Sequence, residues 1–212
     1  MDRSAAVTRI QRELGFRTDL STEIIAALQD AQVELEEAVE LPWFLKDEGL
    51  SDMTTVADTQ TVALPTGFIR EFEDDALHIY DSTADEDEQW TPLVKDTMEY
   101  LRANYPGSGT PVGYCLGVSS YFLFPIPDAI FNLRQVFYKK DTTLATDVEN
   151  LWLEHAHDLM IGVAGQKIAR ALRDRNALVE FEKMEQKARF RLFYSGEARE
   201  HENKRYAMGG ED

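Results

Sequence analysis

The spacing of the apolar residues changes twice along this chain of 212 residues. Apolar side chains recur every three or four residues up to Pro42, alternate every second residue from about residue 53, and return to the first spacing after Thr146. The first spacing places side chains on one face of a helix, and the second places them on one face of a strand. We therefore expect an α+β fold: a helical bundle formed by both chain ends, with an inserted small antiparallel β subdomain and an extended C-terminal tail. The expected segments are the helical bundle at 1–50 and 143–193, the β-rich subdomain at 51–142 and the flexible tail at 194–212.

The two chain ends carry the signals of helix starts and stops. Ser4 can cap a first helix, and Gly15-Phe16 supplies a left-handed stop. A second helix is expected to begin near residue 19 or 21 and to end before Pro42. After Thr146 a long helical pattern is expected to break within 173–176 and to give way to the tail beyond residue 195.

The middle of the chain reads as short strands separated by turns. Two strands are expected around Asp58-Thr59, and a hairpin is expected around Ser119-Ser120. The stretch "PIPD" predicts a structural elbow, because proline fixes φ and donates no backbone hydrogen bond. We expect the elbow to redirect the chain so that two consecutive strands share one antiparallel sheet, with a register slip near Gln135. The elbow residues are Pro125, Pro127 and Asp128.

The charge is strongly acidic and unevenly distributed. The chain has a net charge of −17, and such a surface repels phosphate, since nucleic-acid affinity comes mainly from Lys and Arg. Residues 71–88 carry nine acids and no Lys or Arg, whereas residues 167–191 carry eight Lys or Arg and four acids. This asymmetry suits head-to-tail or lateral packing of copies. The alternative explanation of the acidity is solubility alone.

Several function classes find little support in the residues. Cys115 is the one cysteine, which excludes an intrachain disulfide and favours assembly in a reducing cytoplasm. No apolar run approaches the roughly 18 residues of a membrane span, and the first residues lack the apolar core of a signal peptide. We therefore expect no membrane partner.

The best candidate for metal binding is "LEHAHDL", which contains Glu154, His155, His157 and Asp158. Two histidines two residues apart on a helix point about 200° apart, whereas helical zinc sites place them four residues apart. There is no G-x-S-x-G motif and no glycine-rich phosphate loop, and pairs of acids arise by chance among 39 acidic residues. We expect no metal, no cofactor and no enzymatic activity.

The order of the elements carries a family resemblance. Two N-terminal helices end at a tryptophan, and short strands around "LPTGF" and "WTPL" and the short helix "YLRANYP" follow. Next come "YFLFPIPDAIFNLRQVFYKKD" and a helix with "HDLMIGVAGQKIA". Over roughly residues 20–193 this order resembles the head-to-tail adaptor proteins of short-tailed bacteriophages, also called connector or tail-tube adaptor proteins.

The resemblance implies a structural virion protein at the head–tail interface, assembled in the host cytoplasm. It implies a homo-oligomeric ring, usually twelve-fold, that joins the portal protein to the tail nozzle protein and extends the DNA channel. Tail fibre proteins are a further partner. An acidic lumen would let DNA pass without specific binding.

Two groups of contact residues are hypotheses within this picture. A polar tail that orders on a partner predicts a portal contact at the end of the last helix and in the tail. The portal-contact residues are Phe190, Arg191, Phe193, Tyr194, Arg205 and Tyr206. An acidic loop is expected on the tail side or in the lumen. Its residues are Asp81, Asp85, Glu86, Asp87 and Glu88.

Three alternatives stay open. One is another virion connector ring, such as a head-completion or nozzle component. The second is a non-enzymatic cytoplasmic scaffold module, which would be monomeric or dimeric and indifferent to portal protein. The third is an acid-rich hydrolase, which would show converging carboxylates in a closed pocket.

Overall fold

The computed structural model describes residues 1–47, 53–72, 76–80, 89–145, 148 and 150–208, with side chains as far as Leu192. Backbone contacts divide the chain into two compact units. Residues 1–45 and 141–212 form the helical unit, and residues 46–140 form the β unit. Helices and mainly antiparallel sheets together agree with the expected α+β class.

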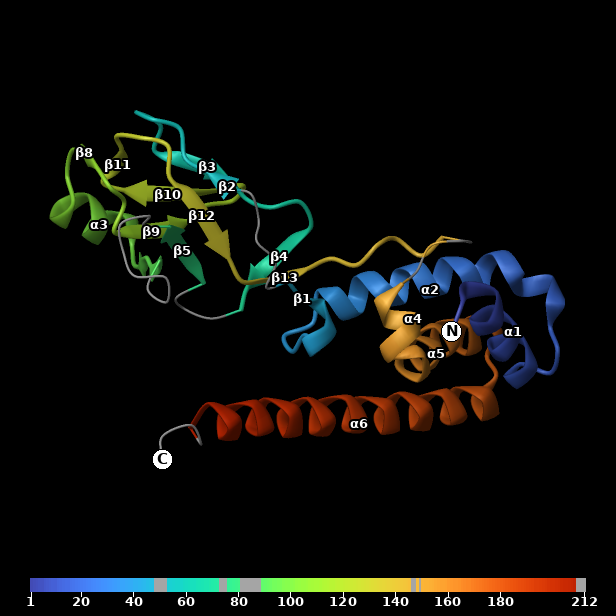
Figure 1. The fold of residues 1–212 in the computed structure, drawn as a ribbon. Helices are drawn as coiled ribbons and strands as arrows, with labels where there is room; N and C mark the ends of the chain where they lie inside the picture. The colour runs from blue at the N-terminus through green and yellow to red at the C-terminus, as the bar shows by residue number, and fades with distance from the viewer. Residues whose placement is uncertain (48–52, 73–75, 81–88, 146–147, 149, 209–212) are drawn as a thin grey trace. The chain divides into compact units, whose positions relative to one another are not determined.

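The helical unit is built around α5. Its elements are α1 (Arg3–Glu13), η1 (Thr18–Leu20), α2 (Ser21–Glu36), η2 (Trp43–Leu45), α4 (Leu151–His155), α5 (His157–Leu172) and α6 (Arg175–Met208). In Figure 1, α5 lies between α2 above and α6 below. Every residue of α5 from Leu159 to Gln166 is buried, so this stretch is covered on all its sides. An apolar stripe of α2 faces inward; it comprises Ile24, Ala27, Leu28, Ala31 and Leu35.

Local backbone chemistry sets most of the helix ends. Gly15 and Phe16 have φ values of 75° and 64°, which confirms the left-handed stop after α1. Arg173 has a φ of 57° and separates α5 from α6, as the sequence predicted. The cap of α1 was predicted wrongly. Asp2, and not Ser4, accepts the hydrogen bond from a first-turn amide, because the helix already begins at Arg3.

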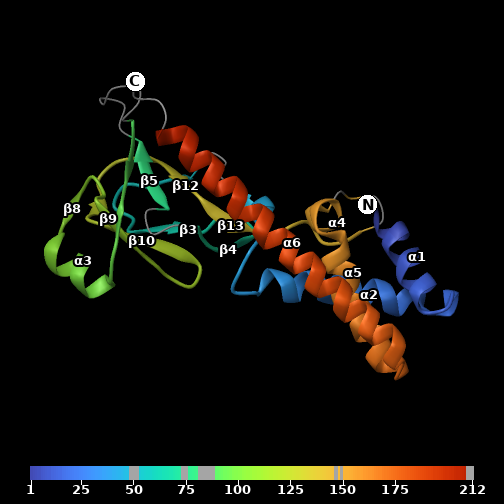
Figure 2. The ribbon, with the colours of Figure 1, turned by 90° about the horizontal axis from the view of Figure 1, so that it is seen from below.

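The end of α6 also differs from the expectation. The sequence placed the end of the last helix near residue 195, whereas the backbone is helical as far as Met208. Residues 197–208 are rich in Glu, Ala, Arg and Lys, which have high helix propensity, and a single glycine at position 196 costs a helix only about 1 kcal/mol. Seen from below, α6 lies in front of α5 and extends past it (Figure 2). The flexibility of 194–212 in the isolated chain stays a prediction.

The β unit consists of short strands and one helix. Its elements are β1 (Lys46–Asp47), β2 (Met53–Thr54), β3 (Thr61–Ala63), β4 (Phe68–Glu71), β5 (Leu77–Tyr80), β6 (Trp90–Pro92), β7 (Val94–Lys95), α3 (Met98–Asn104), β8 (Ser108–Gly109), β9 (Gly113–Leu116), β10 (Ser120–Phe124), β11 (Ile126–Pro127), β12 (Asn132–Gln135) and β13 (Phe137–Lys139). Among the described residues the strand orders are β1-β13-β4, β3-β10-β9-β7, β11-β8 and β2-β12-β5-β6. Pairs β8–β11 and β7–β9 are parallel, and the others are antiparallel. The main apolar core joins Met53, Val62, Leu77, Ile79, Leu93, Tyr114, Tyr121, Leu123 and Leu133.

The predicted hairpin around Ser119-Ser120 is confirmed, because β9 and β10 pair in antiparallel fashion. The two strands around Asp58-Thr59 exist, but they do not pair with each other. Instead, β2 pairs with β12 and β3 pairs with β10. Asp58 itself has a φ of 59°, and its amide donates to the carbonyl of Pro127 at 2.8 Å. The turn therefore leads the chain from one sheet to another.

The elbow also leads the chain from one sheet to another. The expectation that the strands before and after it share one sheet was wrong. The Phe124–Pro125 bond is cis, and Asp128 donates its amide to the carbonyl of Gly109 at 3.3 Å. Strand β10 before the elbow and strand β12 after it belong to different sheets. The two strands do not share a sheet because β11, which contains Pro127, pairs with β8 between them.

The expected register slip near Gln135 is also wrong. Leu133, Gln135 and Phe137 are all buried, so the alternation continues without interruption. Gln135 occupies a core position because its side-chain amide donates to the hydroxyl of Tyr121. A register shift occurs instead between Tyr138 and Lys139, where β13 pairs with β4.

Candidate functional site

A buried polar network fixes the place where the chain returns from the β unit to the helical unit. The Glu36 side chain on α2 is 6% exposed, and its Oε1 accepts from the Asp141 amide at 3.1 Å, the Trp152 indole at 3.3 Å and the Gln32 amide group at 3.0 Å. Asn150 donates to the carbonyl of Thr142 at 2.9 Å. A buried carboxylate with three donors is well compensated, so α2 and the returning chain are held together.

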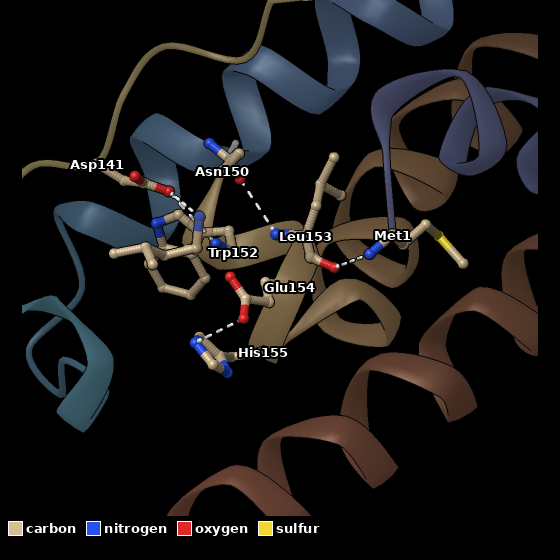
Figure 3. A network of polar contacts seen from close by, with 8 residues as sticks. Met1, Asp141, Asn150, Trp152, Leu153, Glu154 and His155 are labelled. Carbon is tan, nitrogen blue, oxygen red and sulfur yellow. Dashed lines mark hydrogen bonds and ion pairs between the residues drawn. The ribbon is translucent and has the colours of Figure 1, made fainter. Parts of the chain in front are cut away.

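The same network starts α4, as Figure 3 shows. The Asp141 carboxylate accepts from the amide of Leu151 at 2.6 Å, and the Asn150 side chain accepts from the amide of Leu153 at 3.1 Å. These contacts satisfy amides that have no partner inside a helix. The N-terminal ammonium of Met1 donates to the carbonyl of Leu153 at 3.2 Å. Helix α4, and hence the start of α5, is held from both sides.

Small residues bring α5 and α6 close together. A Cβ added at Gly162 would lie 2.8 Å from the backbone nitrogen of Glu185, and one added at Gly165 would lie 2.4 Å from the ring of Phe181. Real Cβ atoms avoid such distances, so both positions require glycine at this crossing. The Glu185 side chain accepts from Gln166 of α5 and from Arg189 of α6. The first part of α6 is therefore rigidly seated on α5.

A groove of about 300 Å³ lies where α6 passes the start of α5. Its lining residues are Trp43, His155, Ala156, His157, Asp158, Leu159, Ala188, Arg191 and Leu192. Asp158 forms an ion pair with Arg9 at 2.7 Å, and the ring of His155 lies against that of Trp43 at a tilt of 55°, with ring centroids 5.1 Å apart. His155 and His157 thus have different neighbours. Within the described part of the chain, no group of three or more His, Cys, Asp or Glu could hold a metal ion.

The predicted portal-contact residues all belong to α6. Phe190 is 61% exposed and Arg191 is exposed beside the groove. Phe193, Tyr194, Arg205 and Tyr206 lie on the helical backbone of α6, beyond the last described side chain. The acidic-loop residues Asp81, Asp85, Glu86, Asp87 and Glu88 lie outside the described residues. The structure thus brings the portal-contact residues onto one helix, and the elbow residues Pro125, Pro127 and Asp128 lie in the β unit.

Among the described residues of the β unit, Cys115 and Tyr121 have raised pKa values. Burial raises the pKa of the Cys115 thiol, which disfavours the reactive thiolate. Burial and the nearby Glu71 carboxylate raise the pKa of the Tyr121 hydroxyl, so it stays protonated. Glu71 forms an ion pair with Lys95 at 2.5 Å. Cys115 and Tyr121 are thus buried, uncharged parts of the interior of the β unit.

Sequence reasoning missed the Glu36 network and the Arg9–Asp158 ion pair. Glu36 lies in an acidic stretch, which is typical of a solvent-exposed helix face. The sequence alone does not distinguish this buried acid from the exposed acids beside it. A usable signal was its position one residue after Leu35, at the edge of the buried stripe.

The described residues form a helical core with a long helix seated on it, and a small β unit. The SU10 adaptor protein family model matches residues 1–207, so the chain belongs to this family. It is a structural adaptor protein of a bacteriophage and a component of the virion, and family membership implies contacts with portal and tail components and with copies of itself. No curated protein matches the chain. None of the helices in the described residues is long and apolar enough to cross a membrane.

Proposed function

We propose that the chain is a ring-forming head-to-tail adaptor that joins the portal to the tail nozzle and extends the DNA channel. The family match over residues 1–207 carries this proposal. The ring is twelve-fold, assembles in the host cytoplasm and lets DNA pass without specific binding. The net charge of −17 per copy supports the last point, because an acidic wall does not hold a phosphate backbone.

The portal contact is assigned to the end of α6. Helix α6 has 34 residues and α5 has 16, which correspond to about 51 Å and about 24 Å of helix. Helix α5 alone therefore cannot cover the C-terminal half of α6. Aromatic and arginine residues dominate protein interfaces. Phe190 and Arg191 lie directly before this half of α6, and Phe193, Tyr194, Arg205 and Tyr206 lie within it. The β unit, with the acidic loop at 81–88, would face the nozzle and the tail fibre proteins.

Binding to purified portal tests the assignment. Removal of residues after Ser195, or the pair Phe190→Ala and Arg191→Ala, is expected to weaken portal binding by at least about tenfold. Val118→Ala is the matched control, because Val118 is a fully exposed apolar side chain of the β unit. Unchanged portal binding by the truncated chain would overturn the assignment to α6. Absence of portal binding by the full chain would overturn the proposed function.

A further inference from the structure

The outer face of α2 is acidic. Residues 21–40 contain no Lys or Arg. The exposed acids of this segment are Glu23, Asp30, Glu34, Glu37 and Glu40. Between them lie the exposed small apolar residues Ala26 and Val33, and Val33 is 55% exposed. Positions 23, 26, 30, 33 and 37 step by three and four residues, so they form one stripe along the helix. An exposed aliphatic stripe flanked by acids is suited to pack against a basic helix.

The outer face of α6 has the opposite charge. Its exposed bases between residues 175 and 187 are Arg175, Lys183 and Lys187, and they flank Val179, which is 46% exposed. Two of the three acids of this stretch interact with α5, and the third, Glu180, is exposed beside Lys183, so the exposed bases still outnumber the exposed acids. Glu182 lies 3.9 Å from Arg170 of α5, Glu185 contacts Gln166 of α5, and Glu180 pairs with Lys183 at 2.8 Å.

The two faces point away from each other. Gly162 of α5 contacts α6, whereas Lys167 of α5 forms an ion pair with Glu34 of α2 at 3.0 Å. Five residues of a helix correspond to a rotation of about 140°, so α2 and α6 cover different sides of α5. Figure 1 agrees, with α5 between them. The stripe from Glu23 to Glu37 and the stretch from Arg175 to Lys187 each measure about 20 Å.

We propose that the outer face of α2 in one copy docks on the outer face of α6, at residues 175–187, in the next copy. This inference rests on the proposed ring and names its lateral contact. Two different faces on opposite sides of one rigid unit make a heterologous contact, and such contacts close into rings when the rotation per copy permits. Charge complementarity selects a second copy as the occupant, because the chain supplies both the acidic stripe and a basic face of matching length.

The size of the contact indicates how strong it is. A helix face about 20 Å long and about 10 Å wide covers roughly 200 Å² on each copy. The total of roughly 400 Å² is below the roughly 1,200 Å² of a stable interface. Copies are therefore expected to associate only weakly in free solution and to form a ring when a platform holds them side by side.

Charge exchange tests the contact with the full chain. One variant carries Asp30→Lys and Glu37→Lys, and a second carries Lys183→Glu and Lys187→Glu. Sedimentation equilibrium at low salt should show weak self-association of the native chain, and each variant should lose at least about tenfold in association constant. A third variant that combines all four changes should regain the association. The control is Glu13→Lys with Glu99→Lys, which makes the same charge change as the first variant at exposed acids outside both faces. It should leave the association constant within about twofold of that of the native chain.

The outcomes separate this contact from the proposed function. The contact is wrong if the native chain stays monomeric at about 1 mM and low salt. It is also wrong if the variant with all four substitutions associates no better than the variants with two substitutions. Imaging of the portal with bound adaptor provides the second measurement. Rings that form equally well from all variants would overturn the contact and leave the adaptor function standing. Association that follows the charge exchange, together with no portal binding, would support the contact and overturn the adaptor function.

Discussion

Replacement of Gly162 by alanine should destabilise the helical unit, although alanine is the better helix former. The new Cβ would meet the backbone of Glu185 at 2.8–3.0 Å, so α6 would have to move away from α5. Overpacking of this kind costs up to about 3 kcal/mol, and the gain in helix propensity returns about 1 kcal/mol. We expect a net loss of about 2 kcal/mol, which corresponds to a decrease in Tm of roughly 4–8 °C.

Thermal unfolding followed by circular dichroism at 222 nm measures this loss, because the signal comes mainly from helices. Ala171→Gly is the matched control. Ala171 is exposed on the same helix, so this change reports helix propensity alone and should cost about 1 kcal/mol. A Gly162→Ala variant that is as stable as the native chain, or more stable, would show that α5 and α6 are not in close contact at this position.

Three further predictions concern buried polar groups. Glu36→Ala should cost about 3 kcal/mol in urea unfolding, because the Trp152 indole and two other donors lose their acceptor; a loss below 1 kcal/mol would contradict the network. Tyr121→Phe should lower the free energy of unfolding by about 1–3 kcal/mol, because the Gln135 amide loses its partner. Burial raises the pKa of Tyr121 in the folded chain, so above about pH 10 this tyrosine ionises in the unfolded chain only. The native chain should therefore become less stable above about pH 10, and the variant should lack this decrease. The buried Cys115 thiol, whose pKa is raised, should react with a thiol reagent at pH 8 much more slowly than free cysteine and at the normal rate in denaturant; fast reaction of the folded chain would contradict its burial.

The sequence predicted the features that depend on neighbouring residues. The stop at Gly15-Phe16 and the break at Arg173 follow from left-handed backbone conformations, which leave a local signature. The helix caps were harder to predict, because several residues that can cap a helix lie next to one another in the sequence. At the start of α3, Thr97 accepts from the amide of Tyr100, and the neighbouring Asp96 accepts from the amide of Thr97. Which candidate is used depends on where the first turn begins.

Features that depend on distant partners could not be read from the sequence. Gln135 is polar, and the partner of its buried side-chain NH2 group is the hydroxyl of Tyr121, on another strand. A pattern of apolar residues therefore shifts by one position there and suggests a slip. The sheet exchange at the elbow has the same origin, because the partner of β11 is β8, which precedes it by many residues. For the candidate site, the excess of bases at residues 167–191 was visible in the composition, but the sequence did not show which of these bases face outward.

The charge of an outer helix face is set by the side chains that do not make contacts inside the helical unit. On α6, Glu182 and Glu185 are turned toward α5, and this leaves a basic outer face on a helix that also contains acids. On α2, Glu36 is turned inward to hold the chain at Asp141, while the acids around it stay outside. Helix α2 contains acids but no Lys or Arg, and α6 contains both acids and bases. Folding turns some of these charges inward and leaves an acidic outer face on α2 and a basic outer face on α6. In the lateral contact proposed above, these two faces of opposite sign are the surfaces through which neighbouring copies would meet.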